Sequence, residues 1–151
     1  MKWVTRERPK TDRIACPWLI RNFIDPEAEF LYVPAADVLA VAEREGALSY
    51  DAPGARYTHR DGLCSFEVLL EEHGLDDPAL ALLARIVHGA DVAEDLDATP
   101  QSPGLLAVAE GFQSDKGRGK QGYGEVNSFF WEKTAETVGA VTGAVDRKSV
   151  V

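Results

Sequence analysis

The fold is decided by the segment KWVTRERPKTDRIACPWLIRNFIDPEAEFLYV at residues 2–33. Its first residues have the β-branched and aromatic character of a short strand, and residues 29–33 have the same character. Between them, Thr11 can cap a helix over residues 12–24, with the charge of Asp12 in the first turn, where it suits the helix dipole. The segment therefore predicts a strand–helix–strand unit.

The same alternation continues to residue 50. A helix is predicted over residues 35–45, with Gly46 at its end, and a strand-like run follows at residues 48–50. Strands that alternate with helices favour a small, largely parallel sheet whose ligand crevice lies beyond the carboxyl ends of the strands. Thr5 and Arg6 are therefore expected at the edge of a crevice.

The rest of the chain is predicted to be mainly helical. After a candidate edge strand at residues 56–58, apolar residues recur at helical spacing from Phe66 to His73. Further helices are expected at residues 78–88, where Gly89 stops the helix, from Ser102 onward, and at residues 125–138. We therefore predict an α+β (or small α/β) fold, with a short, largely parallel N-terminal sheet in a helix-rich domain.

The length of 151 residues is the usual size of one domain, and 45% hydrophobic with 27% charged residues is an ordinary globular composition. We expect a single domain over residues 1–138 and a flexible C-terminal tail over residues 139–151. The glycine-rich, basic stretch at residues 114–124 has too little apolar content to order itself, so it is predicted to be a mobile loop.

The net charge of -9 argues against nucleic acid or an anionic membrane as a partner, because both require a positive field. The N-terminal residues lack the apolar core of a signal peptide, and no apolar run approaches the roughly 20 residues of a membrane span. These features predict a cytoplasmic protein, in which Cys16 and Cys64 are expected to be free thiols.

The stretch THRDGLCSFE at residues 58–67 places an imidazole, a carboxylate and a thiol close together. Cys64 occupies the N-cap of a capping-box pattern with Glu67 at N3, and the positive helix end together with His59 favours a thiolate. His59, Asp61 and Cys64 form a ligand set that suits zinc, iron or copper if a fourth group approaches. The alternative is that Cys64 is a small buried hydrophobe and His59 a polar turn residue.

Cys16 lies in the first half of the first predicted helix, on a face that continues with apolar residues. Pro17 removes a helix amide, so the helix is expected to kink there or to start later than Thr11 suggests. This unusual backbone favours a functional thiol, whereas the apolar face favours simple packing. Near the end of another predicted helix, the dipole alone explains His88, while Asp91 could turn toward a site.

Basic residues gather at the end of the first strand and the start of the first helix, where backbone amides point outward. A tetrahedral oxyanion would be held well there. The alternative is a solvated basic surface that balances the acidic remainder of the chain. The residues of this cluster are Arg6, Arg8, Lys10 and Arg13.

Two segments, WVTRERPKTDRIACPWLIRNFIDPEAEFLYVP (residues 3–34) and HRDGLCSFEVLLEEHGLDDPALALLARIVHGAD (residues 59–91), resemble the C-terminal ChrB-type domain of bacterial chromate-resistance proteins. The resemblance implies a chromate-responsive regulator or resistance factor and raises the weight on a shared site of His59, Cys64 and Cys16. After Gly111 the chain departs from the family, whose members usually carry a longer acidic, histidine-containing segment there. The other matching positions are Arg6, Glu7, Arg8, Asp12, Arg13, Pro17, Trp18, Arg21 and Asp91.

Three hypotheses follow. In the first, which we favour, His59 and Cys64, with Cys16 and Asp91, bind zinc or iron, and a set of arginines receives an oxyanion such as chromate or sulfate. In the second, the chain is a thiol-dependent enzyme with Cys64 as nucleophile and His59 as base. In the third, it is an interaction module that docks through residues 114–124, and homodimer formation is left open. The arginines of the first hypothesis are Arg6, Arg8, Arg13 and Arg21.

Overall fold

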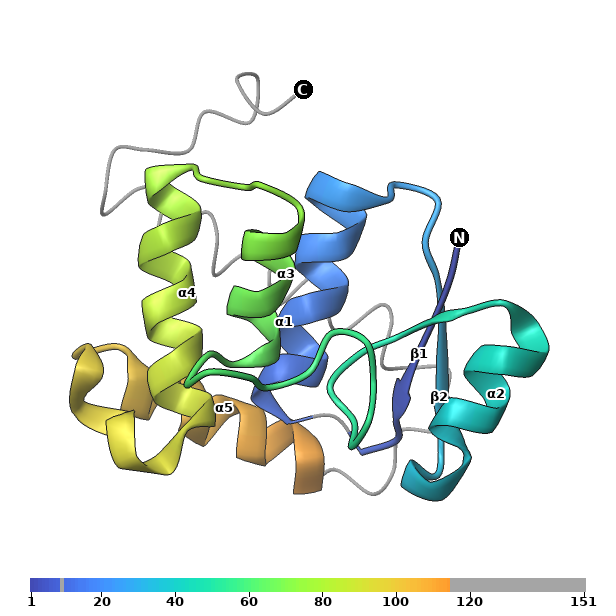
Figure 1. Ribbon diagram of the computed structural model, residues 1–151. Coiled ribbons are helices and arrows are strands. Elements are labelled where there is room, and N and C mark those ends of the chain that lie inside the picture. The colour runs from blue at the N-terminus through green and yellow to red at the C-terminus, as the bar shows by residue number, and fades with distance from the viewer. Residues whose placement is uncertain (9, 115–151) are drawn as a thin grey trace.

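The computed structural model describes residues 1–8 and 10–114 (Figure 1). The predicted helix at residues 125–138, the predicted tail and all but the first residue of the predicted loop lie outside the described residues.

Three parallel strands form the sheet in the order β2-β1-β3. They are β1 (Lys2–Arg6), β2 (Glu29–Val33) and β3 (Leu48–Ser49). The predicted parallel N-terminal sheet is therefore confirmed. The candidate edge strand at residues 56–58 is reduced to a single bridge between Tyr50 and Tyr57.

Helices make up most of the remaining described chain, which confirms the α+β fold. The α-helices are α1 (Thr11–Leu19), α2 (Val38–Glu45), α3 (Ser65–Glu72), α4 (Pro78–Asp91) and α5 (Ser102–Ser114). A π-helical turn at Ile20–Ile24 extends α1, and 3-10 segments occupy Ala35–Asp37 and Ala93–Ala98. No helix of this described part is both long and apolar enough to cross a membrane.

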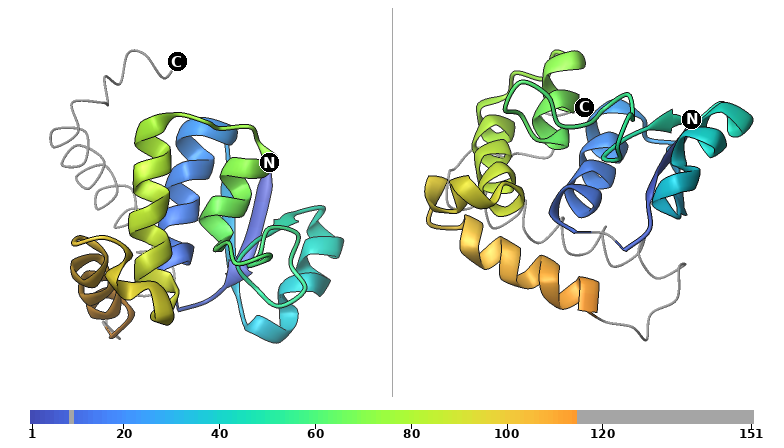
Figure 2. Two further views of the ribbon diagram at one scale, coloured as in Figure 1. Left: turned by 60° about the vertical axis from the view of Figure 1, so that its left-hand side comes forward. Right: turned by 60° about the horizontal axis from the view of Figure 1, so that its bottom comes forward.

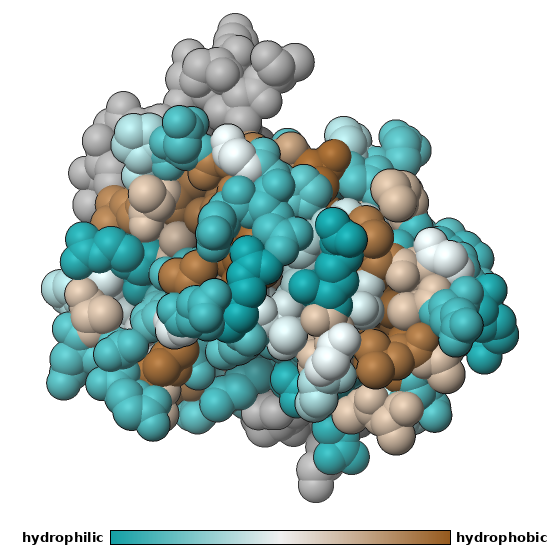
Figure 3. Space-filling model, viewed as in Figure 1, coloured by the Kyte–Doolittle hydropathy of each residue, from teal (hydrophilic) through white to brown (hydrophobic). Residues whose placement is uncertain are grey.

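The sheet separates two cores. Because side chains alternate along a strand, Trp3 and Val4 of the central strand point to opposite faces. Trp3 joins the larger core, with residues from α1, α3, α4 and α5, whereas Val4 packs with Val38 and Val41 of α2. The ribbon views accordingly show α1 and α2 on opposite sides of the strands (Figures 1 and 2). On the face seen in Figure 3, hydrophilic residues surround separate apolar patches.

Pro17 is accommodated inside α1. The helix begins at Thr11, so of the two alternatives, a kink or a later start, the later start is wrong, and Thr11 is the first residue of the helix rather than its cap. The hydroxyl of Thr11 donates instead to the carbonyl of Ala90 in α4, at 3.3 Å. After Pro17 the helix widens into a π-helical turn, where the amide of Asp25 donates to the carbonyl of Ile20 at 2.7 Å.

Gly89 does not stop α4, which continues to Asp91. Its role is close packing, because a Cβ atom at this position would lie 2.8 Å from Cβ of Ser102 and 2.9 Å from the carbonyl oxygen of Asp95. Glycine is therefore required where the end of α4 meets α5 and the preceding 3-10 segment.

Replacing Gly89 by alanine should destabilise the protein by about 1–3 kcal/mol, because the added methyl group overpacks this junction. Gly104→Ala is the matched control: Gly104 lies in α5 with nothing within 4 Å of the added Cβ, so the change should be neutral or stabilise by up to about 1 kcal/mol. Denaturant unfolding of both variants measures the difference. Equal free energies of unfolding would contradict the packing role of Gly89.

Candidate functional site

A groove lies beyond the carboxyl ends of β1 and β3, as the alternating pattern predicts. Its volume is about 430 Å³, and Arg6 stands at its edge, at the end of β1. The start of α1, the loop before α3 and the end of α4 complete its walls. The charged residues that line the groove are Arg6, Lys10, Arg13, Asp51, His59 and Asp91.

Asp51, two residues after the end of β3, forms part of the wall of this groove. Its side chain is buried, and its Oδ2 accepts hydrogen bonds from Arg13 at 2.8 Å and Arg6 at 3.3 Å. Its Oδ1 accepts from the hydroxyl of Ser65 at 3.0 Å, and its backbone carbonyl accepts from Nε of Arg6 at 2.9 Å. With φ at +43°, Asp51 adopts the left-handed conformation that aspartate tolerates better than most residues. One carboxylate thus fixes both guanidinium groups of the groove.

His59 lies among carboxylates. Its Nε2 is 2.9 Å from Oδ2 of Asp91, 3.2 Å from Oδ2 of Asp12 and 3.7 Å from Oδ1 of Asp51. Hydrogen bonds to Asp12 and then to Asp91 raise the pKa of His59 to about 10, against the opposing effect of partial burial. The imidazole is therefore positively charged at neutral pH.

Asp12 is a fully buried carboxylate in the first turn of α1. Its Oδ2 accepts the backbone amide of Ser65 at 2.7 Å as well as facing His59, whereas its Oδ1 has no hydrogen-bond partner among the described residues. Burial, followed by the charges of Asp91 and Asp51, raises the pKa of Asp12 to about 6, although His59 opposes the shift. At neutral pH the structure therefore holds an ionised carboxylate in its interior.

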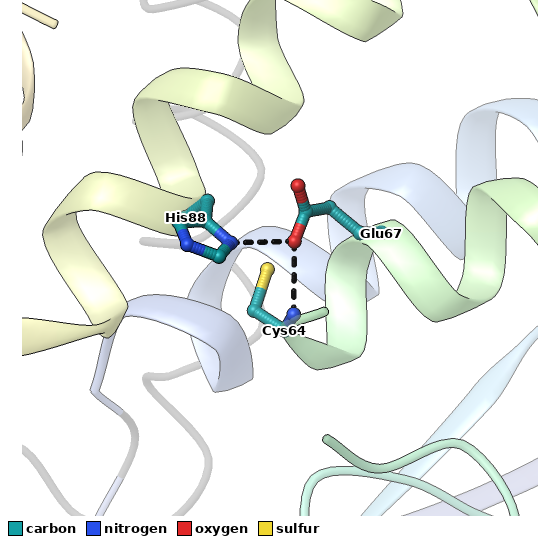
Figure 4. A group of neighbouring side chains, drawn as sticks. All are labelled: Cys64, Glu67 and His88. Carbon is teal, nitrogen blue, oxygen red and sulfur yellow. Dashed lines mark hydrogen bonds and ion pairs between the residues drawn. The ribbon is translucent and has the colours of Figure 1, made fainter. Parts of the chain in front are cut away.

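A second cluster lies at the start of α3 and is made by Cys64, Glu67 and His88 (Figure 4). The predicted capping box is confirmed, because Oε2 of Glu67 accepts the backbone amide of Cys64 at 2.9 Å. The same oxygen is 2.6 Å from Nδ1 of His88, and Nε2 of His88 is 2.7 Å from Oδ2 of Asp95. The thiol of Cys64 points toward the space between Glu67 and His88 (Figure 4).

Both thiols are free, as expected. Both are also buried, and this burial contradicts the expectation of a thiolate at Cys64. Burial and then the negative charge of Asp12 raise the pKa of Cys64 above its usual range, since they outweigh the hydrogen bonding at the helix start. Burial likewise raises the pKa of Cys16, which packs in the larger core. Neither thiol is activated by its surroundings.

The structure divides the residues that the sequence assigns to one metal site. His59 and Asp91 lie together in the groove, Cys64 lies in the cluster with Glu67 and His88, and Cys16 lies in the core. The interval of five residues between His59 and Cys64 suggests a shared site, but the turn at Asp61 and Gly62 intervenes, with φ of +51° and +80°.

The predicted oxyanion residues are divided as well. Arg6 and Arg13 line the groove. Arg8 is exposed, and its carbonyl accepts a hydrogen bond from Arg13 at 3.0 Å. Arg21 is also exposed and lies outside the groove, with its guanidinium 5.3 Å from the centre of the Phe30 ring.

Sequence reasoning missed several residues of the two clusters. Asp12 was noted for its place in a helix turn and as a position that matches the family, and His88 only for its helix end. Asp51 follows a strand that precedes a turn, so its burial had no local signal. Asp91, already predicted as a ligand, follows His88 at helical spacing i+3, the one pattern that could have drawn attention to that histidine.

Comparison with known proteins identifies the family. The model for the ChrB C-terminal domain matches residues 3–130, so the chain belongs to this family. Protein ChrB of Cupriavidus metallidurans is 43% identical over 114 residues, which cover 75% of this chain and 31% of that protein. The chain thus spans about a third of the length of this relative. No solved structure matches the chain.

The charge of His59 predicts a pH dependence of stability. Since folding raises its pKa from 6.5 to about 10, its contribution is complete below pH 6.5 and is lost as the pH rises through 10. The free energy of unfolding should therefore fall over this interval by about 1 kcal/mol, a value reduced for the solvent screening of a partly exposed side chain. Folding raises the pKa of Asp12 to about 6, so the titration of Asp12 changes the free energy of unfolding mainly below pH 6.5, outside this interval.

Denaturant unfolding at several pH values measures the effect, and the matched control is His59→Gln. The variant should show a smaller loss of stability between pH 6.5 and 10 than the parent protein, since the other titrating groups are common to both. Parallel pH profiles would contradict the ion-paired state of His59.

Proposed function

We propose that this chain is a chromate-resistance-type domain that binds a tetrahedral oxyanion, chromate or sulfate, in the groove beside His59. Membership of the ChrB C-terminal domain family supports the class of function. The observation that carries the proposal is the gathering of Arg6, Lys10, Arg13 and charged His59 around one groove in a chain of net charge -9. A concave surface with cationic walls raises the local concentration of small anions.

The carboxylates of the groove do not prevent anion binding, because each already contacts a cationic side chain. Asp51 holds the two guanidinium groups, and Asp91 contacts His59 and the backbone amide of Asp12, at 3.4 Å. Their charge is therefore largely balanced before a ligand arrives. Lys10 has no ion pair among the described residues, so its ammonium group is available to an anion at the start of α1.

Chromate and sulfate are tetrahedral dianions, and a guanidinium group can offer two N–H donors to one edge of such an ion. Arg6, whose side chain is 34% exposed, can contribute in this way while its Nε stays bonded to the carbonyl of Asp51. The groove is larger than one such ion, so ordered water is expected to fill the remainder.

Binding has more support than thiol catalysis. A nucleophilic Cys64 needs a thiolate and a nearby base, but its thiol is buried with a raised pKa. The proposed base, His59, is engaged with carboxylates and protonated at neutral pH. The domain is therefore proposed to recognise the oxyanion, which serves sensing or sequestration.

Isothermal titration of the whole chain with sodium chromate, and separately with sodium sulfate, tests the proposal. Arg6→Gln and Lys10→Gln should each weaken binding by about 10-fold or more, since a charged hydrogen bond contributes about 1.5–3 kcal/mol. Arg21→Gln is the matched control, because it removes the same charge far from the groove lining, and its affinity should equal that of the parent. Absence of binding, or equal weakening in all three variants, would refute the groove as the site.

A further inference from the structure

Three side chains of different ligand chemistry converge at the start of α3. Cys64 is the N-cap of this helix, Glu67 is its third residue, and His88 projects from the neighbouring α4. Their ligand atoms, one thiol sulfur, one carboxylate oxygen and one imidazole nitrogen, all lie within 4.8 Å of one another (Figure 4). This arrangement differs from the groove, which contains no thiol.

We propose that Cys64, Glu67 and His88 bind a divalent transition-metal ion of the Zn²⁺ type, with the fourth position open to water or another small ligand. Tetrahedral zinc with bonds of about 2.0–2.3 Å places its ligand atoms roughly 3.3–3.8 Å apart. The three side chains therefore need shifts of only about an ångström. On binding, the thiol of Cys64 and Nδ1 of His88, which lies 2.6 Å from the carboxylate of Glu67, each release one proton to solvent, and the ion takes the place of these protons on sulfur and nitrogen.

The charges of the three ligands fit such an ion. A thiolate and a carboxylate carry two negative charges, and a neutral imidazole adds none, so the complex with a divalent cation is neutral. A neutral complex suits this position because Cys64 is fully buried and the side chains of Glu67 and His88 are only 20% and 15% exposed.

Asp95 supplies the outer partner that metal-binding histidines usually have. Its Oδ2 lies 2.7 Å from Nε2 of His88, so it keeps a proton on Nε2 when Nδ1 gives up its own proton and offers its electron pair to the ion. The backbone amide of Cys64 orients the carboxylate of Glu67 in the same way. Hydrogen bonds thus orient both the imidazole of His88 and the carboxylate of Glu67 toward the proposed metal position.

The other group with metal-ligand chemistry, Asp12, His59 and Asp91, is less suited to a cation. Its groove is also lined by Lys10, which forms no ion pair among the described residues and whose positive charge repels a metal ion. No cationic side chain forms an ion pair with Glu67 among the described residues except His88 itself. The thiol cluster is therefore the better candidate.

Titration of the metal-free whole chain with Co²⁺ under reducing conditions, followed by competition with Zn²⁺, tests this site. One equivalent of Co²⁺ should produce the intense near-ultraviolet absorption of a thiolate–cobalt bond, and Zn²⁺ should abolish it. Cys64→Ser should remove this absorption, and Asp95→Asn, at an exposed position, should weaken Co²⁺ binding by about 10–100-fold. Cys16→Ala and Arg21→Gln, which change residues outside the cluster, are the controls and should bind Co²⁺ like the parent.

Circular dichroism establishes that each variant is folded, and Asp95→Asn keeps the test decisive if Cys64→Ser does not fold. Absence of thiolate–cobalt absorption in the parent would overturn the proposal, as would its loss in either folded control variant or full retention of affinity in Asp95→Asn. The proposal does not rest on oxyanion binding, because the titration uses neither chromate nor sulfate and none of its variants changes a residue that lines the groove.

Discussion

The buried carboxylate of Asp12 is the interaction on which the arrangement of both clusters depends. It projects from the first turn of α1, accepts the backbone amide of Ser65 at the first turn of α3 and faces the imidazolium of His59. A buried charge is costly unless it is paired and hydrogen-bonded, and these two partners supply what the interior lacks. The starts of two helices and the loop of His59 are therefore held together by one side chain, and Asp51 ties the same helices to the sheet.

The first turn of α3 lies between the groove and the thiol cluster, whose side chains differ in chemistry. Consecutive amides at its start donate to different carboxylates, that of Cys64 to Glu67 and that of Ser65 to Asp12. The Asp12 side belongs to a groove of guanidinium, ammonium and imidazolium groups, which suits a hard anion. The Glu67 side presents a thiol and an imidazole, which suit a softer cation. A member of the ChrB C-terminal domain family with these two proposed sites would respond to an oxyanion and a metal ion independently.

Much of the fold could be predicted from the sequence, because periodicity, the capping box and the alternation of strands and helices are local signals. Residues 2–33 predicted a strand, a helix and a strand, and Glu67 predicted the start of α3. The prediction that Gly89 ends its helix was wrong, because the sequence alone does not distinguish a glycine required by close packing from a glycine that ends a helix. The histidine that lies beside Cys64 could not be predicted from neighbouring residues either. Proximity in sequence favoured His59, whereas the packing of α4 against α3 brings His88 to this position.

The central claim is that this family member has two separate sites, an anion groove and a thiol cluster, on either side of the Asp12 carboxylate. Anomalous X-ray scattering at the zinc and chromium edges, from crystals equilibrated with Zn²⁺ and chromate, tests it most directly. We expect a zinc peak bonded to Cys64 and His88 and a distinct chromium peak beside Arg6 and Lys10. A zinc peak among Asp12, His59 and Asp91, or the absence of chromium from the groove, would contradict it.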